Sequence, residues 1–287
     1  GDGLKIQEVI KRGPFAVKKN EVTAGCIIEK IDGEAIKAGK DYNALLDGQA
    51  GKNVRLTIKN TKGKTFDLTI KAISQGYQQE LLYKRWVDRN RAIVDSVSKG
   101  RIAYVHVKAM NSESFRTVYS ELLSDKNRNK DAVIVDERHN GGGWLHDDLC
   151  TLLSGKQYQE FVPHGKVVGK DPFNKWTKPS CVLICEDDYS NGHGFPWVYK
   201  ELGIGKLIGA PVAGTMTAVW WENQIDPSIV FGIPQVGCMD MRGQYAENHQ
   251  LSPDIEVYNT PEKALAGEDQ QLEAAVQEML KTIGEKK

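Results

Sequence analysis

The residues best suited to chemistry lie in the stretch 186–196, which reads EDDYSNGHGFP. An apolar run at 181–185 (CVLIC) predicts a buried strand before it, and an amphipathic run at 195–202 predicts a helix after it. Ser190 therefore falls on the turn between strand and helix, followed by Asn191 and Gly192. A serine in this position exposes its hydroxyl, and the free N–H groups that begin the helix point at whatever reacts with it. The same residues also fit a serine that only caps a helix.

A second strand end carries three consecutive glycines. The apolar run 132–135 is followed by DERHNGGGWL, in which Gly141, Gly142 and Gly143 precede a predicted helix. Consecutive glycines cost backbone entropy, so they are tolerated where the backbone approaches another group closely or adopts positive φ. The segment lacks the Lys-Ser/Thr of a P-loop and the spaced glycines of a dinucleotide-binding fold. A pair of backbone N–H groups directed at an oxyanion fits better.

The elements that must position these residues differ along the chain. Up to about residue 73, short β-rich runs alternate with turns, and strands 54–59 and 65–70 face each other across a hairpin turn at 60–64. Residues 79–98 are charged and helix-prone. From residue 101 the pattern becomes an alternation of strands (102–107, 132–135, 182–184, 207–208) and helices (112–123, 145–153, 197–202, with 269–283 at the end). This alternation predicts an α/β layer with several parallel strands, in which functional loops lie beyond the carboxyl ends of the strands.

Composition narrows the class of protein. The chain of 287 residues is 40% hydrophobic and 26% charged, which is typical of a soluble protein with two domains. Its formal net charge of zero gives no electrostatic case for a nucleic-acid or membrane-surface partner. No apolar run approaches the roughly 20 residues that span a bilayer. The five cysteines are scattered in apolar surroundings, so we expect buried free thiols, no metal site at Cys181 and Cys185, and no cofactor.

Three motifs together carry a family resemblance: DERHNGGG, EDDYSNGHGFPWVYKELGIGKLIG and YAENHQLSPDIEV. They follow a region (GCIIEKIDGEAI, short helix, hairpin) that resembles the PDZ domain attached to bacterial proteases. In this order they resemble the PDZ domain and C-terminal catalytic core of the tricorn-type proteases, a branch of the S41 serine peptidases. The resemblance implies a PDZ-like β-rich domain at 1–75, a helical connector at 76–100, and a catalytic core at 101–287. The expected fold is therefore α+β to α/β, with a partly parallel core sheet layered as in Clp peptidase and crotonase folds.

The resemblance also assigns roles to single residues. It makes Ser190 the nucleophile and places the oxyanion hole at the N–H groups of Gly143 and Asn191. Glu247 would be the acidic member that orients the catalytic base. The nearest positions to the family's specificity residue are Glu160 and Phe161, so we expect these two residues at a substrate pocket. Phe161 stands where the family has an acidic specificity residue, so the resemblance implies a preference for apolar or mixed substrates. Trp220 and Trp221 fit core or interface positions better than this cleft.

The catalytic base is the point at which this sequence departs from the family pattern. In the tricorn branch the histidine lies upstream of the PDZ domain, and none of the six histidines here is in an equivalent place. His193, His249, His139 and His146 are poor substitutes, and residues 214–221 contain no lysine for a Ser-Lys pair. We therefore expect a serine endopeptidase core with an incomplete active site that is inactive, or nearly so, by itself. The alternative is a non-catalytic PDZ-type peptide-binding protein that retains the fold.

The resemblance further implies peptide substrates and a homo-oligomer, trimeric or hexameric. The chain carries no signal-peptide core, and we expect a bacterial or archaeal protein of the cytoplasm or periplasm, with the compartment undetermined.

Overall fold

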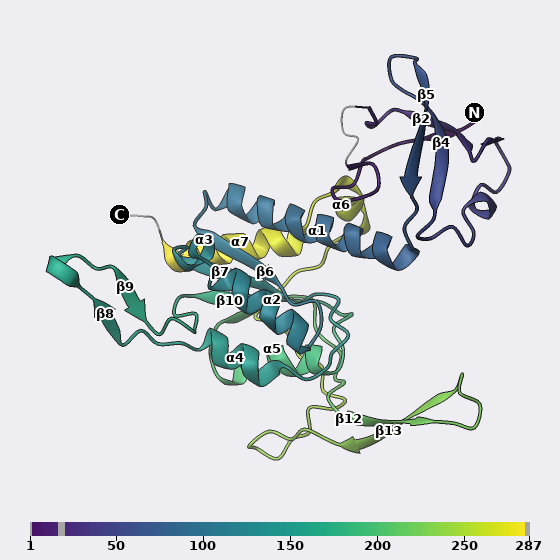
Figure 1. The fold of residues 1–287 in the computed structure, drawn as a ribbon. Helices are drawn as coiled ribbons and strands as arrows, with labels where there is room; N and C mark the ends of the chain where they lie inside the picture. The colour runs from purple at the N-terminus through teal and green to yellow at the C-terminus, as the bar shows by residue number, and fades with distance from the viewer. Residues whose placement is uncertain (1, 17–20, 285–287) are drawn as a thin grey trace. The chain divides into compact units, whose positions relative to one another are not determined.

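The computed structural model describes residues 2–16 and 21–284. These residues divide into two compact units, 1–89 and 90–287, and the division falls inside the long helix α1 (Gln75–Val97) (Figure 1). The mixed α/β fold, with a β-rich N-terminal region and a parallel sheet in the core, is confirmed. The predicted domain boundaries at 75 and 100 stay predictions, although α1 covers most of the expected connector.

The first unit contains one antiparallel sheet. Its strands are β1 (Leu4–Lys5), β2 (Ile27–Ile31), β3 (Glu34–Ala35), β4 (Asn53–Lys59) and β5 (Thr65–Lys71). They run in the order β1-β2-β4-β5, with β3 paired to β2. The predicted hairpin is β4–β5, and its turn contains Gly63 with φ 82°. Alternate residues of β4, Val54, Leu56 and Ile58, point into the core of this unit, and the expected short helix is the 3-10 turn η2 (Asn43–Leu45).

The second unit is built on a five-stranded parallel sheet. Its order is β14 (Ile255–Glu256), β11 (Lys206–Gly209), β10 (Ser180–Ile184), β7 (Ala132–Asp136) and β6 (Ile102–His106). Every residue of β6, β7 and β10 is buried, because helices cover both faces of the sheet. The helices α2 (Ser112–Leu122), α4 (His146–Leu153) and α5 (Asn191–Glu201) cover one face, while α7 (Gln270–Ile283) covers the other (Figure 1). The short helices α3 (Asp125–Arg128) and α6 (Pro261–Ala266) also belong to the second unit.

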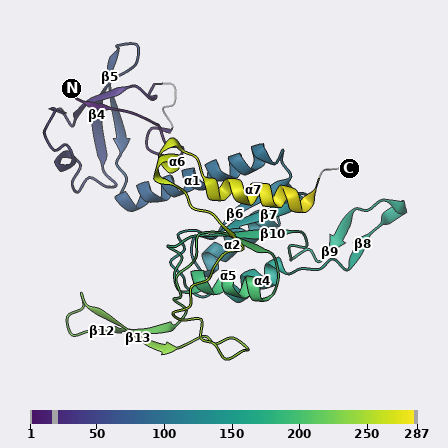
Figure 2. The same cartoon turned by 180° about the vertical axis from the view of Figure 1, so that it is seen from behind.

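Two hairpins leave this layered core. One is β8 (Gln159–Phe161) with β9 (Gly169–Asp171), which enclose the 3-10 turn η3 (Pro163–Gly165). The other is β12 (Ala218–Asn223) with β13 (Val230–Val236), and both project from the sheet and its helices (Figure 2). Neither hairpin was predicted from the sequence. Within residues 2–16 and 21–284, no helix is both long and apolar enough to cross a membrane.

The sheet order explains why the two predicted motifs meet. Strands β7 and β10 are adjacent and parallel, with Leu183 opposite Asp136. The glycine loop follows β7 and the Ser190 turn follows β10, so both loops leave the same edge of the sheet.

Candidate active site

Ser190 sits at the N-cap of α5 with an unusual backbone, φ 56° and ψ −118°. Positive φ at a residue other than glycine costs about 1–3 kcal/mol and persists only where the surroundings impose it. A capping serine has an extended backbone and accepts a hydrogen bond from the first turn. The Ser190 side chain makes no such bond, so a role as a simple helix cap does not fit.

Neighbouring backbone groups hold this turn in place. The Ser190 N–H donates to Thr215 Oγ1 at 3.1 Å, and the Tyr189 N–H donates to the Asn140 carbonyl at 2.9 Å. Gly142 has φ 92°, and a Cβ at this position would lie 2.6 Å from the Ser190 Cβ. The second glycine of the triplet is therefore required, because its backbone packs directly against the serine.

Two backbone N–H groups beside Ser190 have no acceptor. In the part of the chain that the structure describes, neither the Gly143 N–H nor the Asn191 N–H makes a hydrogen bond. Both residues line the same cavity as Ser190. Gly143 has φ 133°, and a Cβ there would lie 2.1 Å from the Met110 carbonyl oxygen. This close approach locks the third glycine in position and leaves its N–H free for a ligand.

The side chain of Asn191 connects the two loops. Its Oδ1 accepts hydrogen bonds from the N–H groups of Leu145 (2.7 Å) and His146 (3.1 Å), which begin α4. Its Nδ2 lies 2.8 Å from His146 Nδ1. The residue at the N-cap of α4, Leu145, has no capping side chain of its own. Asn191 therefore supplies the missing cap and fixes the glycine loop relative to the first turn of α5.

Glu247 is placed by the segment that also holds Ser190. Its Oε2 accepts the N–H groups of Met216 and Thr217, each at 2.7 Å, directly after the Thr215 that binds Ser190. Burial alone would raise the pKa of Glu247, but the hydrogen bonds from Thr217 and Met216 outweigh it and hold the pKa below its usual value. An ionised carboxylate is thus fixed one short segment away from the serine.

A cavity of about 340 Å³ opens in front of these groups. Its lining includes no histidine and no lysine, and consists of Gly141, Gly143, Trp144, Tyr189, Ser190, Asn191, Met216, Thr217, Ala218, Val219 and Trp221. Trp221 lies on β12 and is 66% exposed, so the hairpin forms one wall of the cavity. Trp220 is 57% exposed and does not line it. The core position is therefore wrong for both tryptophans, because a two-stranded hairpin has no second layer to bury them, and the interface position stays a prediction.

Comparison with protein families shows which family the chain belongs to. The description "Peptidase family S41" matches residues 101–257, which is more than half of the chain and includes the glycine loop, Ser190 and Glu247. The chain belongs to peptidase family S41. A second description, "Tricorn protease PDZ domain", matches residues 6–75 of this S41 chain.

Individual relatives agree with the family. The S41 chain is 27% identical over 260 residues to the tricorn protease of Thermoplasma acidophilum, covering 90% of this chain and 24% of that protein. It is 29% identical over 280 residues to a putative tricorn-like protease C-terminal subunit of Sulfurisphaera tokodaii, covering 96% of this chain and 31% of that protein. A crystal structure of the tricorn protease superposes with a TM-score of 0.84 at 25% identity, over 99% of this chain and 27% of that one. The chain thus spans a quarter to a third of the length of these relatives.

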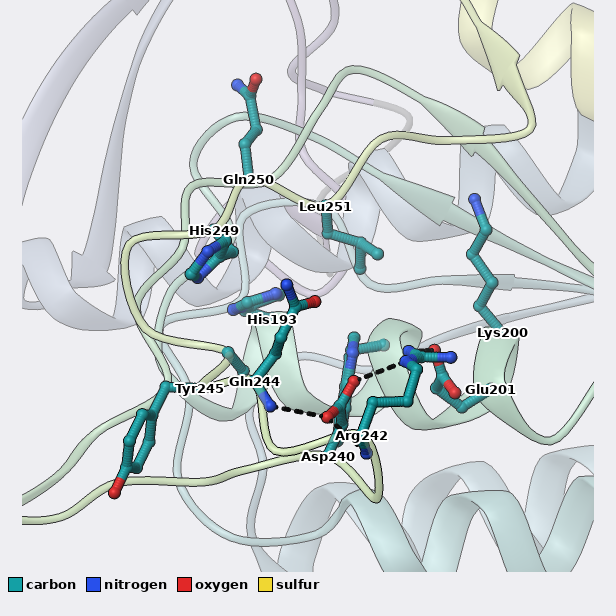
Figure 3. Close-up of a pocket in the computed structure, with 12 residues that line it drawn as sticks. His193, Lys200, Glu201, Asp240, Arg242, Gln244, Tyr245, His249, Gln250 and Leu251 are labelled. Carbon is teal, nitrogen blue, oxygen red and sulfur yellow. Dashed lines mark hydrogen bonds and ion pairs between the residues drawn. The ribbon is translucent and has the colours of Figure 1, made fainter.

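None of the six histidines of this S41 chain lines the cavity at Ser190. His193 and His249 line a second cavity of about 230 Å³ (Figure 3). The His193 Nδ1 is buried and has no hydrogen-bond partner among the described residues. Burial lowers the pKa of His193, and the nearby Glu247 carboxylate only partly opposes this.

The other two histidines considered from the sequence are engaged elsewhere. His146 Nδ1 accepts from the Asn191 amide, and His139 Nδ1 lies 3.0 Å from Asp187 Oδ2. Among the described residues, none donates to or accepts from the Ser190 hydroxyl. Among the described residues, the serine, the acid and the free N–H groups are therefore assembled without a base that is hydrogen-bonded to the Ser190 hydroxyl.

The expected substrate-pocket residues are not part of this assembly. Glu160 and Phe161 lie on β8, where Glu160 pairs with Lys170 at 3.2 Å and Phe161 stacks on Phe173 with ring centroids 5.9 Å apart. Neither residue lines the cavity at Ser190. The projecting β8–β9 hairpin places them apart from it, and their role in substrate binding stays a prediction.

Two buried carboxyl groups lie beneath the loops. Both carboxyl oxygens of Glu137 are buried without a hydrogen-bond partner in the described chain, and burial raises its pKa well above the usual value. Burial also raises the pKa of Asp188 to about 8, although the N–H groups of Cys185 and Asn140 bind this carboxylate and oppose the shift. Burial therefore favours the protonated, neutral form of Glu137.

The positioning role of residues 215–217 was missed in the sequence. Thr215 binds the Ser190 N–H, and the next two N–H groups, of Met216 and Thr217, bind Glu247. The one available signal was the run Gly214-Thr-Met-Thr, a glycine with small hydroxyl residues between two predicted elements. Such runs are common in turns, so the contact itself could not be read from it.

Proposed function

We propose that this chain is the catalytic core of a serine endopeptidase that cleaves peptides or unfolded polypeptides through an acyl-enzyme. Support comes from the strained backbone of Ser190, which leaves its hydroxyl free and facing a cavity beside two unpaired N–H groups. Structures store strain of this kind at functional sites. Peptide substrates are consistent with the tricorn protease relatives.

In the proposed mechanism the Ser190 Oγ attacks the scissile carbonyl carbon while a base takes its proton. The oxyanion forms at the carbonyl oxygen and is stabilised by the N–H groups of Gly143 and Asn191. The base then returns the proton to the leaving amine, and water hydrolyses the ester on Ser190. The Glu247 carboxylate, kept ionised by the N–H groups of Met216 and Thr217, orients the base.

We further propose that the base is a histidine supplied from outside residues 1–287. No imidazole lines the cavity at Ser190, and the four histidines considered above are placed elsewhere. A serine hydroxyl without a base is a weak nucleophile, and general-base catalysis contributes about 10²–10⁴-fold. Residues 1–287 by themselves should therefore react very slowly. Assembly into a trimer or hexamer stays a prediction from family resemblance.

The test is labelling with a fluorophosphonate, which reacts with activated serines. A longer form of the polypeptide, preceded by its natural upstream segment, should be labelled at least about 100-fold faster than residues 1–287. Ser190→Ala should abolish labelling of the longer form. Ser228→Ala, at an exposed serine of the β12–β13 loop, is the matched control and should leave labelling unchanged.

If the folded longer form is not labelled, the peptidase proposal fails. The protein is then better described as a non-catalytic peptide-binding protein that retains the S41 fold and the PDZ domain.

A further inference from the structure

We propose that His139, Cys185 and Asp187 form a binding site for a zinc-class divalent metal ion. One ligand atom from each, the His139 Nδ1, the Cys185 Sγ and an Asp187 carboxylate oxygen, lie within 4.8 Å of one another. The site is outside the cavity at Ser190 and does not depend on the proposed peptidase activity.

The distances suit a tetrahedral ion. The His139 Nδ1 lies 3.0 Å from Asp187 Oδ2 and 3.8 Å from Cys185 Sγ. Bond lengths of about 2.0–2.3 Å to nitrogen, oxygen and sulfur place tetrahedral ligand atoms about 3.4–3.6 Å apart. The separation between His139 and Asp187 is shorter than this range, and the separation between His139 and Cys185 is longer. The Asp187 side chain is 68% exposed, so it can turn to complete the geometry without moving the core.

The Cys185 sulfur accepts a hydrogen bond from one backbone N–H, and its thiol donates to Asp188 Oδ1 at 3.7 Å. Cys185 is buried, and the backbone N–H of His139 donates to its Sγ at 3.3 Å. Hydrogen bonds from N–H groups stabilise negative charge on sulfur, and outer-shell donors of this kind orient metal ligands.

The donor set selects the class of metal. One thiolate, one imidazole and one carboxylate favour zinc, cobalt or cadmium over calcium or magnesium, which prefer oxygen ligands. Three protein ligands leave a fourth position for water, because His139 and Asp187 lie at the surface above the buried sulfur. Burial raises the pKa of the Cys185 thiol to about 12, so the ion must displace this proton. Affinity should therefore weaken as the pH falls.

A bound ion would join the two loops that carry the site. His139 belongs to the segment that leads to Gly143, and Cys185 and Asp187 belong to the turn that leads to Ser190. The loops already share the hydrogen bonds from Asn140 N–H to Asp188 and from Tyr189 N–H to the Asn140 carbonyl. The metal would add a link at the outer edge of this contact.

Cobalt binding to the metal-free 287-residue chain tests the proposal. We expect saturable binding of one Co²⁺, with a thiolate-to-cobalt charge-transfer band and the intense visible bands of a four-coordinate ion. Zinc should displace the cobalt. At 100 times the dissociation constant, zinc should raise the Tm by about 5 °C.

Variants separate this site from adventitious binding. Cys185→Ser should remove the charge-transfer band, and His139→Gln or Asp187→Asn should each weaken binding at least about tenfold. The latter two residues are exposed, so these variants keep the test valid if Cys185→Ser fails to fold. Cys238→Ser and His164→Gln are the controls, at a partly accessible thiol and an exposed imidazole elsewhere.

Binding that persists in Cys185→Ser, that disappears in Cys238→Ser, or that shows no thiolate band overturns the proposal. So does the absence of saturable binding at millimolar metal.

Discussion

The two sides of the cavity at Ser190 are built in opposite ways. The loops that carry Gly143 and Ser190 are held by side chain and backbone hydrogen bonds, and a Cβ added at Gly142 or Gly143 would clash with neighbouring backbone. The facing wall is the β12–β13 hairpin, most of whose residues are exposed. The groups that we propose to stabilise charge are thus fixed by the core, whereas the hairpin wall of the cavity has little packing to hold it.

The exposed apolar surface of the hairpin reinforces this contrast. Trp220, Trp221, Val230, Phe231 and Val236 are each at least half exposed. Trp220 is opposite Ile233 in the register and Trp221 is opposite Gly232, so the two tryptophans lie on different faces. Only the face with Trp221 lines the cavity. Patches of this kind mark sites of interaction more often than sites of stability.

The largest effect is expected from a substitution in the tightly packed glycine loop. Gly143→Ala places a Cβ 2.1 Å from the Met110 carbonyl oxygen at φ 133°, so both strain and overpacking oppose it. Together these should lower the free energy of unfolding by about 3 kcal/mol, measured by urea denaturation. Gly141→Ala is the matched control, because a Cβ there meets nothing within 4 Å, and it should change stability by less than about 0.5 kcal/mol. Equal effects would show that the glycine loop is not tightly packed.

A smaller effect concerns the carboxyl group beneath the same loops. The pKa of Glu137 is raised above its usual value of 4.5 by burial, so the native state keeps a proton that the unfolded chain has released. The stability that the protonated Glu137 contributes is therefore fully present below pH 4.5 and is lost as the pH rises through the raised pKa. Between pH 5 and 8, Glu137→Gln, which cannot ionise, should lose less unfolding free energy than the wild type, measured by urea denaturation across this range.

The pH dependence that remains in Glu137→Gln should come from groups such as Asp188. Burial raises the pKa of Asp188 to about 8, so its ionisation also lowers stability as the pH rises. A wild-type stability that rises over this range, or a Glu137→Gln profile that matches it, would contradict the burial of a neutral carboxyl group.

The smallest effect on stability is expected on the exposed side. Trp221→Ala should change the unfolding free energy by less than about 0.5 kcal/mol, because the side chain is mostly in solvent. In the form that fluorophosphonate labels, it should raise the KM for peptides several-fold by removing a wall of the cavity. Trp220→Ala, on the other face, should leave the KM unchanged. Similar KM values for both variants would remove the hairpin from substrate binding.

Much of the core was predictable because it depends on local patterns. The apolar runs at 132–135 and 182–184 became β7 and β10, and the helix predicted at 269–283 became α7. Helix α5 begins at Asn191, four residues earlier than its amphipathic run suggested, because glycine and proline weaken the pattern in its first turns. The hairpins were missed because apolar and polar residues do not alternate cleanly in strands that have no buried face.

The sequence by itself determined which residues are candidates: a serine after one strand, a glycine triplet after another, and Glu247 in a motif of the S41 family. Strand and helix periodicity and the special backbone freedom of glycine are local properties, so they can be read from residue order. Only the tertiary structure decided that Ser190 has positive φ, that residues 215–217 link it to Glu247, and that Glu160 lies away from the cavity. These facts depend on contacts between segments far apart in the chain, and no local pattern encodes such contacts.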